Sequence, residues 1–262
     1  MNHAFSIPAY GQSPHLRACI DSILKQSKGG SAVILTTSTP SIFLDQIASA
    51  YRIPLVVNDV RAGIASDWNF ALTASDAHFV TVAHQDDFYA PDFTKLMFEA
   101  LNRHPDTLIA FSNNSEHTPE GPRQVNINLR IKRALSARAF GSSETLSCLW
   151  EKRRLLQLGN PICCPSVIIN RSLVPDFRFI ESMKSNLDWE AWWRLAQLPG
   201  KFVYLKTPLV SKGVHSASET SALIANQLRE QEDRQMFDYF WPRPVAAAIA
   251  MVYKLGYRAN RV

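Results

Sequence analysis

The first third of the chain alternates between short apolar runs and longer stretches in which apolar side chains recur every three or four residues. Short apolar runs bounded by turn residues predict buried strands, whereas the longer spacing predicts helices that bury one face. The predicted strands are residues 5–10, 32–35, 53–57 and 79–83, and the predicted helices between them are residues 14–24, 41–51 and 63–75. Strand–helix units that follow one another in this way predict a parallel sheet with right-handed crossovers.

The pattern becomes less regular after Pro91. Residues 113–125 are expected to form a polar loop, because Pro119, Gly121 and Pro122 break regular structure. The remaining predicted helices are residues 92–103, 130–139, 142–158, 188–198 and 220–240, and the remaining strands are residues 107–112, 167–169, 201–205 and 209–211. The chain therefore divides into a regular β/α half (1–112), an irregular half (113–218) and a helical tail (219–262).

Composition narrows the class of protein. With 262 residues, of which 46% are hydrophobic and 19% charged, the chain can bury a sizeable core. The four cysteines show no CxxC spacing, so reduced thiols in the cytoplasm are expected. No basic segment with a long apolar run follows Met1, and no stretch of about 18 apolar residues occurs. We therefore expect a cytoplasmic protein that has neither a signal peptide nor a membrane span.

Positive charge gathers in two regions of the sequence, whose formal net charge is +5. Residues 123–154 hold eight Lys or Arg against Glu144 and Glu151, and no acid follows Trp241. Such regions suit nucleotides, nucleic acid or anionic lipid, although a solvated basic face is the simpler interpretation of each. No nucleic-acid-binding motif with interleaved aromatic residues occurs, so no nucleic-acid partner is expected.

The tail contains an apolar segment with basic flanks, residues 244–258. Its uninterrupted apolar part, residues 245–253, is too short to span a bilayer. Peripheral contact with the inner face of the membrane is one expectation for this segment, and packing on the domain or on a second subunit is the other. The oligomeric state stays open.

The segment His84-Gln85-Asp86-Asp87 is the strongest candidate for chemistry. It follows the strand expected at residues 79–83, and ligands of α/β enzymes usually bind where such strands end. The two neighbouring carboxylates repel each other, and a divalent cation relieves that repulsion. A metal ion at a strand end suggests phosphate chemistry. The alternative is a polar turn near a helix cap, since Pro91 marks the start of a new helix.

Several segments together resemble the family 2 glycosyltransferases, whose fold is called GT-A. The opening Ser6-Ile7-Pro8-Ala9-Tyr10-Gly11 looks like the family's IPxYN start, and residues 16–26 look like its first helix. Residues 63–72 are similar to its GIA…N.AL segment. The step from His84 to Asp87 falls where the family keeps its DxD-type metal motif.

Two later segments extend the resemblance to roughly residues 5–218. Residues 187–195 are similar to the family's EDWDLWLRL helix, and Val214-His215-Ser216 resembles a His-containing segment that follows the last strands. The resemblance implies a mostly parallel GT-A sheet flanked by helices. It also implies that residues 1–112 bind the nucleotide and that residues 113–218 bind the acceptor.

The resemblance implies roles for individual residues of this chain. Asp86 and Asp87 would hold Mn²⁺ or Mg²⁺, with Asp86 also touching the nucleotide, and His215 would complete the metal or diphosphate site. Asp188 would act as general base. The residues that would lie against the nucleotide are Pro8, Ala9, Tyr10 and Thr37. The implied reaction is inverting transfer of a sugar from a nucleotide-sugar donor to a hydroxyl of a glycan, lipid-linked or protein acceptor, as in polysaccharide biosynthesis.

The chain departs from the family pattern at three positions. His84 replaces the first acid of the DxD form, and imidazole is a softer ligand than carboxylate. Leu187 replaces the Glu of the ED pair. Thr37 stands near the place where an acid often reads the nucleotide base, so UDP is only the default donor base.

Simpler interpretations exist for most of the singled-out residues. Asp188 is also a good helix N-cap, and His215 could be an ordinary loop histidine. Trp189, Trp192 and Trp193 have helical spacing and are more often core residues than sugar-stacking platforms. Cys163 and Cys164 are interpreted as packing residues.

Three other functions compete with sugar transfer. A relative that binds a nucleotide sugar without turnover is compatible with the three departures. A nucleotidyltransferase also uses strand-end acids and a metal, but residues 9–12 do not supply its Gly-rich loop and Lys. A nucleic-acid-binding module is suggested only by the basic regions.

Overall fold

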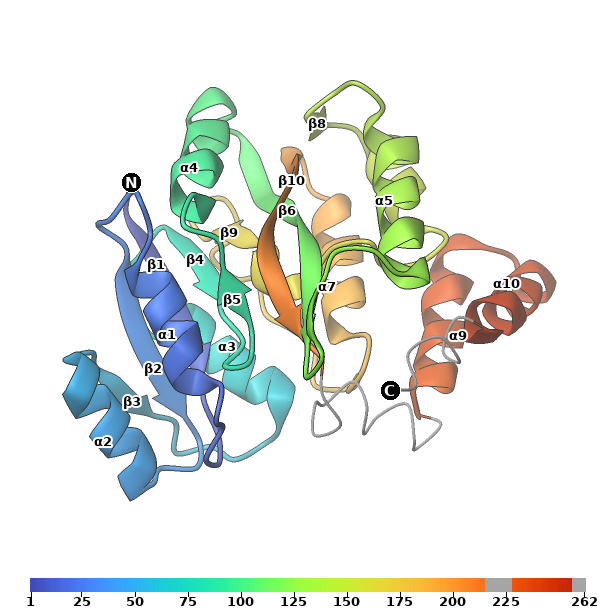
Figure 1. The fold of residues 1–262 in the computed structure, drawn as a ribbon. Helices are drawn as coiled ribbons and strands as arrows, with labels where there is room; N and C mark the ends of the chain where they lie inside the picture. Colours follow the sequence, from blue (N-terminus) through green and yellow to red (C-terminus); the bar gives the residue numbers. More distant parts are fainter. Residues whose placement is uncertain (215–227, 256–262) are drawn as a thin grey trace.

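A computed structural model describes residues 1–214 and 228–255 of the chain. The central sheet has the strand order β3-β2-β1-β4-β9-β6-β10-β5, with β7 paired to β6 and β8 to β10 (Figure 1). The strands are β1 (His3–Pro8), β2 (Ala32–Thr37), β3 (Leu55–Val57), β4 (Phe79–Val82), β5 (Phe88–Tyr89), β6 (Thr107–Thr118), β7 (Gly121–Arg123), β8 (Thr145–Leu146), β9 (Ile168–Asn170) and β10 (Lys201–Gly213).

Most strands of this sheet run in one direction. β3, β2, β1 and β4 pair in parallel, as expected for the regular half, and β6 pairs in parallel with β10. β9 lies between β4 and β6 and is antiparallel to both, and β5 is antiparallel to β10. The mixed α/β fold with a mostly parallel sheet is therefore confirmed.

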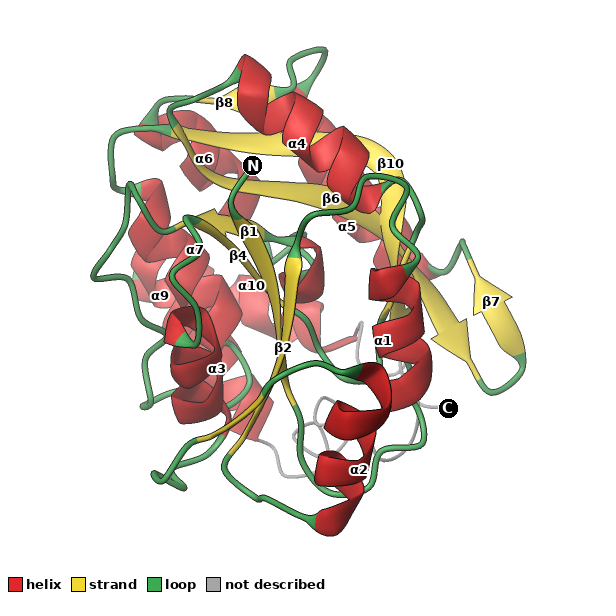
Figure 2. Ribbon diagram, turned by 90° about the vertical axis from the view of Figure 1, so that its left-hand side faces the viewer, coloured by secondary structure: helices red, strands yellow, loops and turns green. Residues whose placement is uncertain are grey.

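Helices cover both faces of the sheet (Figure 2). The helices are α1 (Leu16–Leu24), α2 (Ile42–Tyr51), α3 (Ile64–Thr73), α4 (Phe93–Arg103), α5 (Ile127–Phe140), α6 (Leu149–Leu156), α7 (Leu187–Ala196), α9 (Leu228–Phe240) and α10 (Arg243–Leu255), with a 3₁₀ turn at Cys164–Ser166. α1, α2 and α4 pack into one hydrophobic cluster, and α3, α5, α6, α7 and α9 pack into the other.

Strand β1 shows how the sequence pattern sets these layers. Its side chains alternate between the two faces, so Phe5 and Ile7 enter the cluster beneath α1 whereas Ala4 enters the cluster beneath α3. Such a strand is apolar on both faces because helices cover both. The carboxyl ends of β1, β2 and β4 consequently open at one edge, where ligands of such sheets usually bind.

The prediction of a polar loop at residues 113–125 is wrong. β6 continues to Thr118 and forms a hairpin with β7, so only Pro119 of the expected breakers lies in the turn, whereas Gly121 and Pro122 belong to β7. Along this part of β6 the inward side chains are polar, which hides the usual apolar alternation. Glu116, for example, is buried and accepts hydrogen bonds from the Arg123 guanidinium and the Asn126 amide.

Two further boundaries differ from the sequence-based expectation. The helix expected at residues 142–158 begins only at Leu149, because residues 145–146 pair with β10 as β8 and the Glu151 carboxylate accepts the N–H groups of Ser147 and Cys148 just before the helix. The two short strands expected at residues 201–205 and 209–211 are one strand, β10. Its register shifts on both sides of Pro208, which a strand tolerates as an irregularity.

The tail helices α9 and α10 pack on the domain. Met236, Phe237 and Phe240 of α9 join the same hydrophobic cluster as Trp189 of α7, and the Trp241 indole donates a hydrogen bond to the carbonyl of Gln157. The expected domain boundary at 218/219 lies outside the described residues. Within residues 1–214 and 228–255 no helix is both long and apolar enough to cross a membrane.

Candidate active site

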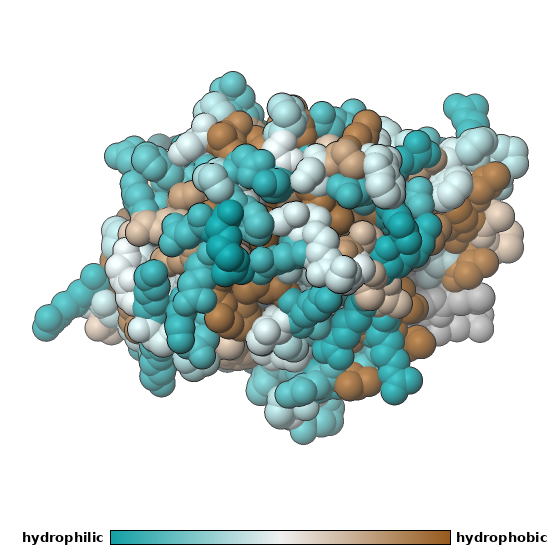
Figure 3. All heavy atoms as spheres, turned by 90° about the horizontal axis from the view of Figure 1, so that it is seen from above, coloured by the Kyte–Doolittle hydropathy of each residue, from teal (hydrophilic) through white to brown (hydrophobic). Residues whose placement is uncertain are grey.

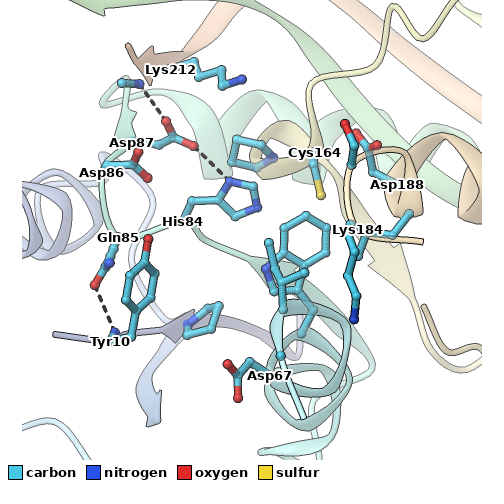
Figure 4. A pocket seen from close by; sticks show the side chains of 18 of the residues that line it. Tyr10, Asp67, His84, Gln85, Asp86, Asp87, Cys164, Lys184, Asp188 and Lys212 are labelled. Carbon is cyan, nitrogen blue, oxygen red and sulfur yellow. Dashed lines mark hydrogen bonds and ion pairs between the residues drawn. The ribbon is translucent and has the colours of Figure 1, made fainter. Parts of the chain in front are cut away.

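A cavity of about 430 Å³ opens at the carboxyl ends of β1, β2 and β4 and extends to α7. Its lining includes every candidate site residue that the structure describes: Pro8, Ala9, Tyr10, Thr37, Asp86, Asp87 and Asp188. His215 lies outside the described residues. The fold thus brings together side chains from both halves of the chain, as Figure 4 shows for the two acidic groups.

The acidic turn after β4 is held in place by the end of β10. The Asp87 carboxyl is 1% exposed, and its Oδ1 accepts the backbone N–H of Gly213 at 2.7 Å. Its Oδ2 lies 3.5 Å from Nδ1 of His84. Burial, together with the neighbouring carboxylate of Asp86, raises the pKa of Asp87 well above its usual value. A cation bound at this turn would favour the ionised form of the buried carboxyl group, as the charge of Lys212 and the N–H of Gly213 already do.

His84 is packed as a neutral ring. Its imidazole stacks on the Trp68 indole with the ring centroids 4.8 Å apart, and burial lowers its pKa to about 4. Because a neutral imidazole carries a lone pair, His84 can act as a metal ligand. His84 therefore offers the softer ligand expected at this position, and its ring is already removed from solvent.

The acidic turn fits a divalent cation. Ligand atoms of His84, Asp86 and Asp87 all lie within 4.8 Å of one another. Among the residues that the structure describes, Nε2 of His84 and Oδ2 of Asp87 are buried without a hydrogen-bond partner. Orphaned buried polar atoms are costly, and a bound cation would satisfy an oxygen of this kind. Two carboxylates and one imidazole suit Mn²⁺, and the carboxylates alone suit Mg²⁺.

Gly213 is required by the close approach of β10 to the acidic turn. A Cβ atom at this position would lie 2.3 Å from the carbonyl oxygen of Asp86, which is closer than real contacts allow. We expect Gly213→Ala to lower the free energy of unfolding by about 1–3 kcal/mol and to weaken metal binding, because the turn must shift. Gly29→Ala is the control, since its Cβ would meet no atom within 4 Å. Chemical denaturation measures both variants, and equal stability of the two would contradict the steric argument.

The strand ends of β1 and β2 form the other wall of the cavity. The backbone N–H of Ala9 donates to the carbonyl of Thr36 at 2.8 Å, and that of Tyr10 donates to Oε1 of Gln85 at 3.2 Å. Tyr10 keeps 48% of its surface exposed, so its ring is available to a ligand. Thr37 is buried, and its hydroxyl accepts the N–H of Thr39.

Asp188 faces the cavity from the first turn of α7. Its Oδ2 accepts a hydrogen bond from the Asn160 amide at 2.9 Å, and its Oδ1 accepts the N–H of Trp189 at 2.8 Å. The N-cap interpretation is wrong, because the helix begins one residue earlier with Asn186 as its cap. Burial raises the pKa of Asp188 from its usual value, while the charge of Lys132 acts in the opposite direction.

The neighbours of Asp188 in sequence have structural positions. Trp189 and Trp192 are fully buried, which confirms them as core residues, and Trp193 packs against the same cluster from a partly buried position. The Glu190 carboxylate forms an ion pair with Arg194 at 2.7 Å, so it does not compete for the role of Asp188. Trp68, which the sequence did not single out, is the tryptophan that packs against the acidic turn and lines the cavity.

The cavity is also lined by cations that the sequence did not single out one by one. Lys132 of α5, Lys184 and Lys212 line it, and within residues 1–214 and 228–255 no ion pair is made by their ammonium groups. Burial lowers the pKa of Lys132. Several cations lining one cavity favour an anionic ligand. In the sequence, the feature that pointed to Lys132 was its place in the basic region at residues 123–154.

Tail helix α9 braces the loop that precedes Asp188. The Glu232 carboxylate accepts the N–H groups of Lys184, Ser185 and Asn186 at 2.7–2.8 Å. Oδ1 of Asp233 accepts a hydrogen bond from the Asn186 side chain at 2.6 Å. Because both acids are almost fully buried, these contacts tie the tail firmly to the wall of the cavity. Nothing in the local sequence pattern predicts this long-range pairing.

Two residues of the tail reach the cavity itself. Arg229 of α9 and Tyr253 of α10 line it, and a hydrogen bond joins the Tyr253 hydroxyl to Arg229. The helical tail expected from sequence thus supplies part of the cavity wall. In the sequence these two residues lie more than 40 positions from Asp188, and no motif connects them to it.

Comparison with known proteins identifies a family. The sequence model described as glycosyl transferase family 2 matches residues 5–165, which is more than half of the chain. A search of curated proteins finds no match.

Solved structures with the same fold are distant in sequence. The structure of S. aureus TarS 1-349 in complex with UDP-GlcNAc has a TM-score of 0.67 and 15% identity, covering 93% of this chain and 72% of that one. The mannosyltransferase PcManGT from Pyrobaculum calidifontis, in complex with GDP-Man and Mn²⁺, has a TM-score of 0.65 and 15% identity, covering 99% and 70%. The longer structure of S. aureus TarS has a TM-score of 0.64 and 16% identity, covering 97% and 43%.

Proposed function

Because the chain belongs to glycosyl transferase family 2 and has the GT-A fold, we propose that it moves a sugar from a nucleotide-sugar donor to an acceptor hydroxyl with inversion at the anomeric carbon. The observation that carries the proposal is the placement of two acidic groups in one cavity. The turn with Asp86 and Asp87 lies on one side and Asp188 on the other, with His84 and Cys164 between them (Figure 4). This arrangement leaves room for a donor diphosphate at one end and an acceptor at the other.

The acidic turn would hold the cation and the donor. Asp86 and Asp87 are the proposed ligands of Mn²⁺ or Mg²⁺, with His84 beside them and His215 as a further ligand. When bound, the cation supplies electrostatic stabilisation of the departing diphosphate. Lys212, at the end of β10, would add a positive charge on the same side. The Mn²⁺ in the mannosyltransferase complex is compatible with this role.

Asp188 would accept the proton of the acceptor hydroxyl as that oxygen attacks the sugar. Its two carboxylate oxygens are oriented by Asn160 and by the N–H of Trp189, and each oxygen keeps a second lone pair for the acceptor. Burial raises the pKa of Asp188, which brings the base closer to the pH at which it must work. Asn160 would act as the residue that positions this base.

The nucleotide would lie at the carboxyl ends of β1 and β2. Pro8, Ala9, Tyr10 and Thr37 would lie against the nucleotide, and Thr37 offers a hydroxyl where an acid is common. A UDP-sugar is the proposed default, and the neighbours include complexes with UDP-GlcNAc and with GDP-Man.

The proposed setting is the cytoplasm, with peripheral contact at the inner face of the membrane through residues 244–258. The proposed acceptors are a glycan, a lipid-linked glycan or a protein, as in the assembly of a polysaccharide.

A protein that binds the donor without turnover is the alternative. It is favoured by Leu187, whose buried side chain offers no ligand atom where the family has an acid. Hydrolysis of the donor with Mn²⁺ separates the two functions, because only the enzyme releases free sugar.

A screen of nucleotide diphosphates and nucleotide sugars by thermal unfolding tests the proposal. A ligand at about 100 times its Kd should stabilise the protein by roughly 2.7 kcal/mol. We expect one nucleotide to produce this shift with Mn²⁺ and to lose most of it with EDTA. Mn²⁺ alone is the control. If no nucleotide raises the unfolding temperature under either condition, the cavity is not a donor site.

A further inference from the structure

Helix α10 presents two apolar faces. Its inner face, with Ala246, Ile249, Ala250 and Tyr253, packs on the domain, and Tyr253 reaches the wall of the cavity. Its outer face is exposed and consists of Pro244, Val245, Ala248, Met251 and Val252. A helix that is apolar all round is normally covered on every side, so the outer face requires an apolar environment.

The exposure of this outer face is large. Met251 is 73% exposed, Val252 is 68% exposed and Val245 is 43% exposed. In Figure 3, apolar side chains gather at the right-hand edge, on the side where Figure 1 draws α10. No charged side chain interrupts the helix between Arg243 and Lys254. An apolar strip of this length is more than isolated surface residues explain.

The ends of the strip are basic. Arg243 stands at its start and Lys254 at its end, and the sequence from Tyr239 onward contains four Lys or Arg and no acid. Lys254 is exposed and forms an ion pair with Glu230 of α9 at 2.8 Å. An apolar strip flanked by cations matches a surface of lipid chains and anionic headgroups.

We propose that the outer face of α10 inserts into the interface of an anionic lipid bilayer. The helix then lies in the membrane plane and does not cross it. Because Tyr253 lines the cavity from the inner face of α10, docking turns the α10 side of the cavity toward the bilayer. The orientation also bears on the acceptor, a step that rests on the proposed function. Among the proposed acceptor classes it selects a lipid-linked acceptor, because the hydroxyl of such an acceptor is presented at the headgroup level.

A second copy of the chain is the competing occupant of the strip. In a twofold contact through α10, antiparallel helices bring Arg243 of one copy to Lys254 of the other, and parallel helices bring like residues together. Either arrangement sets Arg243 against a Lys or Arg of the other copy, and the Lys254 ammonium already has Glu230 of its own copy as partner. The charge pattern therefore favours anionic lipid.

Vesicle co-sedimentation of the full chain tests the proposal. We expect binding to phosphatidylcholine vesicles that contain phosphatidylglycerol, weaker binding when salt is raised, and little binding to phosphatidylcholine alone. The double variant Met251→Gln, Val252→Gln should bind at least about tenfold more weakly, because it makes the strip polar. The control Leu24→Gln, Ile42→Gln changes two exposed residues of α1 and α2 and should bind like the unaltered protein.

The outcomes separate this proposal from the glycosyltransferase function. Absence of vesicle binding, or equal binding to both lipid mixtures, would overturn it. So would a dimer, detected by light scattering, that the Met251/Val252 variant converts to a monomer. Nucleotide-dependent thermal stabilisation is measured on the same samples, so loss of donor binding would count against the proposed function and loss of vesicle binding only against the membrane surface.

Discussion

Replacing Asp188 by Asn is expected to lower the rate of sugar transfer about 10²–10⁴-fold while donor binding stays unchanged. Asn keeps the size of the side chain and can still accept the N–H of Trp189 through its oxygen. It cannot take a proton from the acceptor hydroxyl. The transfer rate under saturating donor, together with the thermal shift produced by the donor, gives both quantities from one preparation.

The pH profile gives a second readout for Asp188. A base must be ionised to act, and burial raises the pKa of this carboxyl. The rate of the unaltered enzyme should therefore fall as the pH falls through the raised pKa, and the Asn variant should lack that step. Asp106→Asn is the matched control, because Asp106 is an exposed partner of Lys201 and is not part of the cavity lining. Full transfer activity in Asp188→Asn would remove Asp188 from the role of base.

Replacing Asp86 by Asn is expected to abolish most of the metal-dependent binding of the nucleotide. Replacing a residue that supports a metal ligand without touching the metal typically weakens metal binding roughly 10–100-fold. Because Asp86 is itself a proposed ligand, its replacement should weaken Mn²⁺ binding by at least that factor. The amide preserves shape but removes the charge that attracts the cation. Titration calorimetry with Mn²⁺ and the nucleotide identified by the screen measures the loss without any need for turnover.

Asp67→Asn is the control within the same cavity. Asp67 lies on α3 and lines the cavity, but it does not belong to the His84–Asp86–Asp87 cluster. The Asp67→Asn variant should bind Mn²⁺ within about threefold of the affinity of the unaltered protein. Asp86 is a better test position than Asp87, because Asp87 also accepts the N–H of Gly213 and its replacement would alter the turn itself. Equal Mn²⁺ affinities in Asp86→Asn and the unaltered protein would show that the acidic turn is no cation site.

The amino-acid sequence by itself determined the regular half of the fold. Apolar runs such as residues 79–83 and the helical spacing of residues 41–51 are local patterns, so the strands and helices of this half were predicted within a few residues. Motif order also placed Asp86, Asp87 and Asp188 in one site, and the structure brings these residues to one cavity. Their roles stay predictions that the variants above test.

Long-range pairing decided what the sequence pattern could not show. The inward residues of β6 beyond Ser112 are polar and satisfied by partners such as Arg123, so the strand looked like a loop. The three N–H partners of Glu232 lie 46–48 positions away in the sequence. Gly213 is required only because β10 meets the acidic turn. Local spacing encodes which face of an element is buried, whereas the partners of a buried polar group depend on which elements the fold brings together. For that reason only the tertiary structure showed that the tail, through Arg229 and Tyr253, is part of the cavity wall.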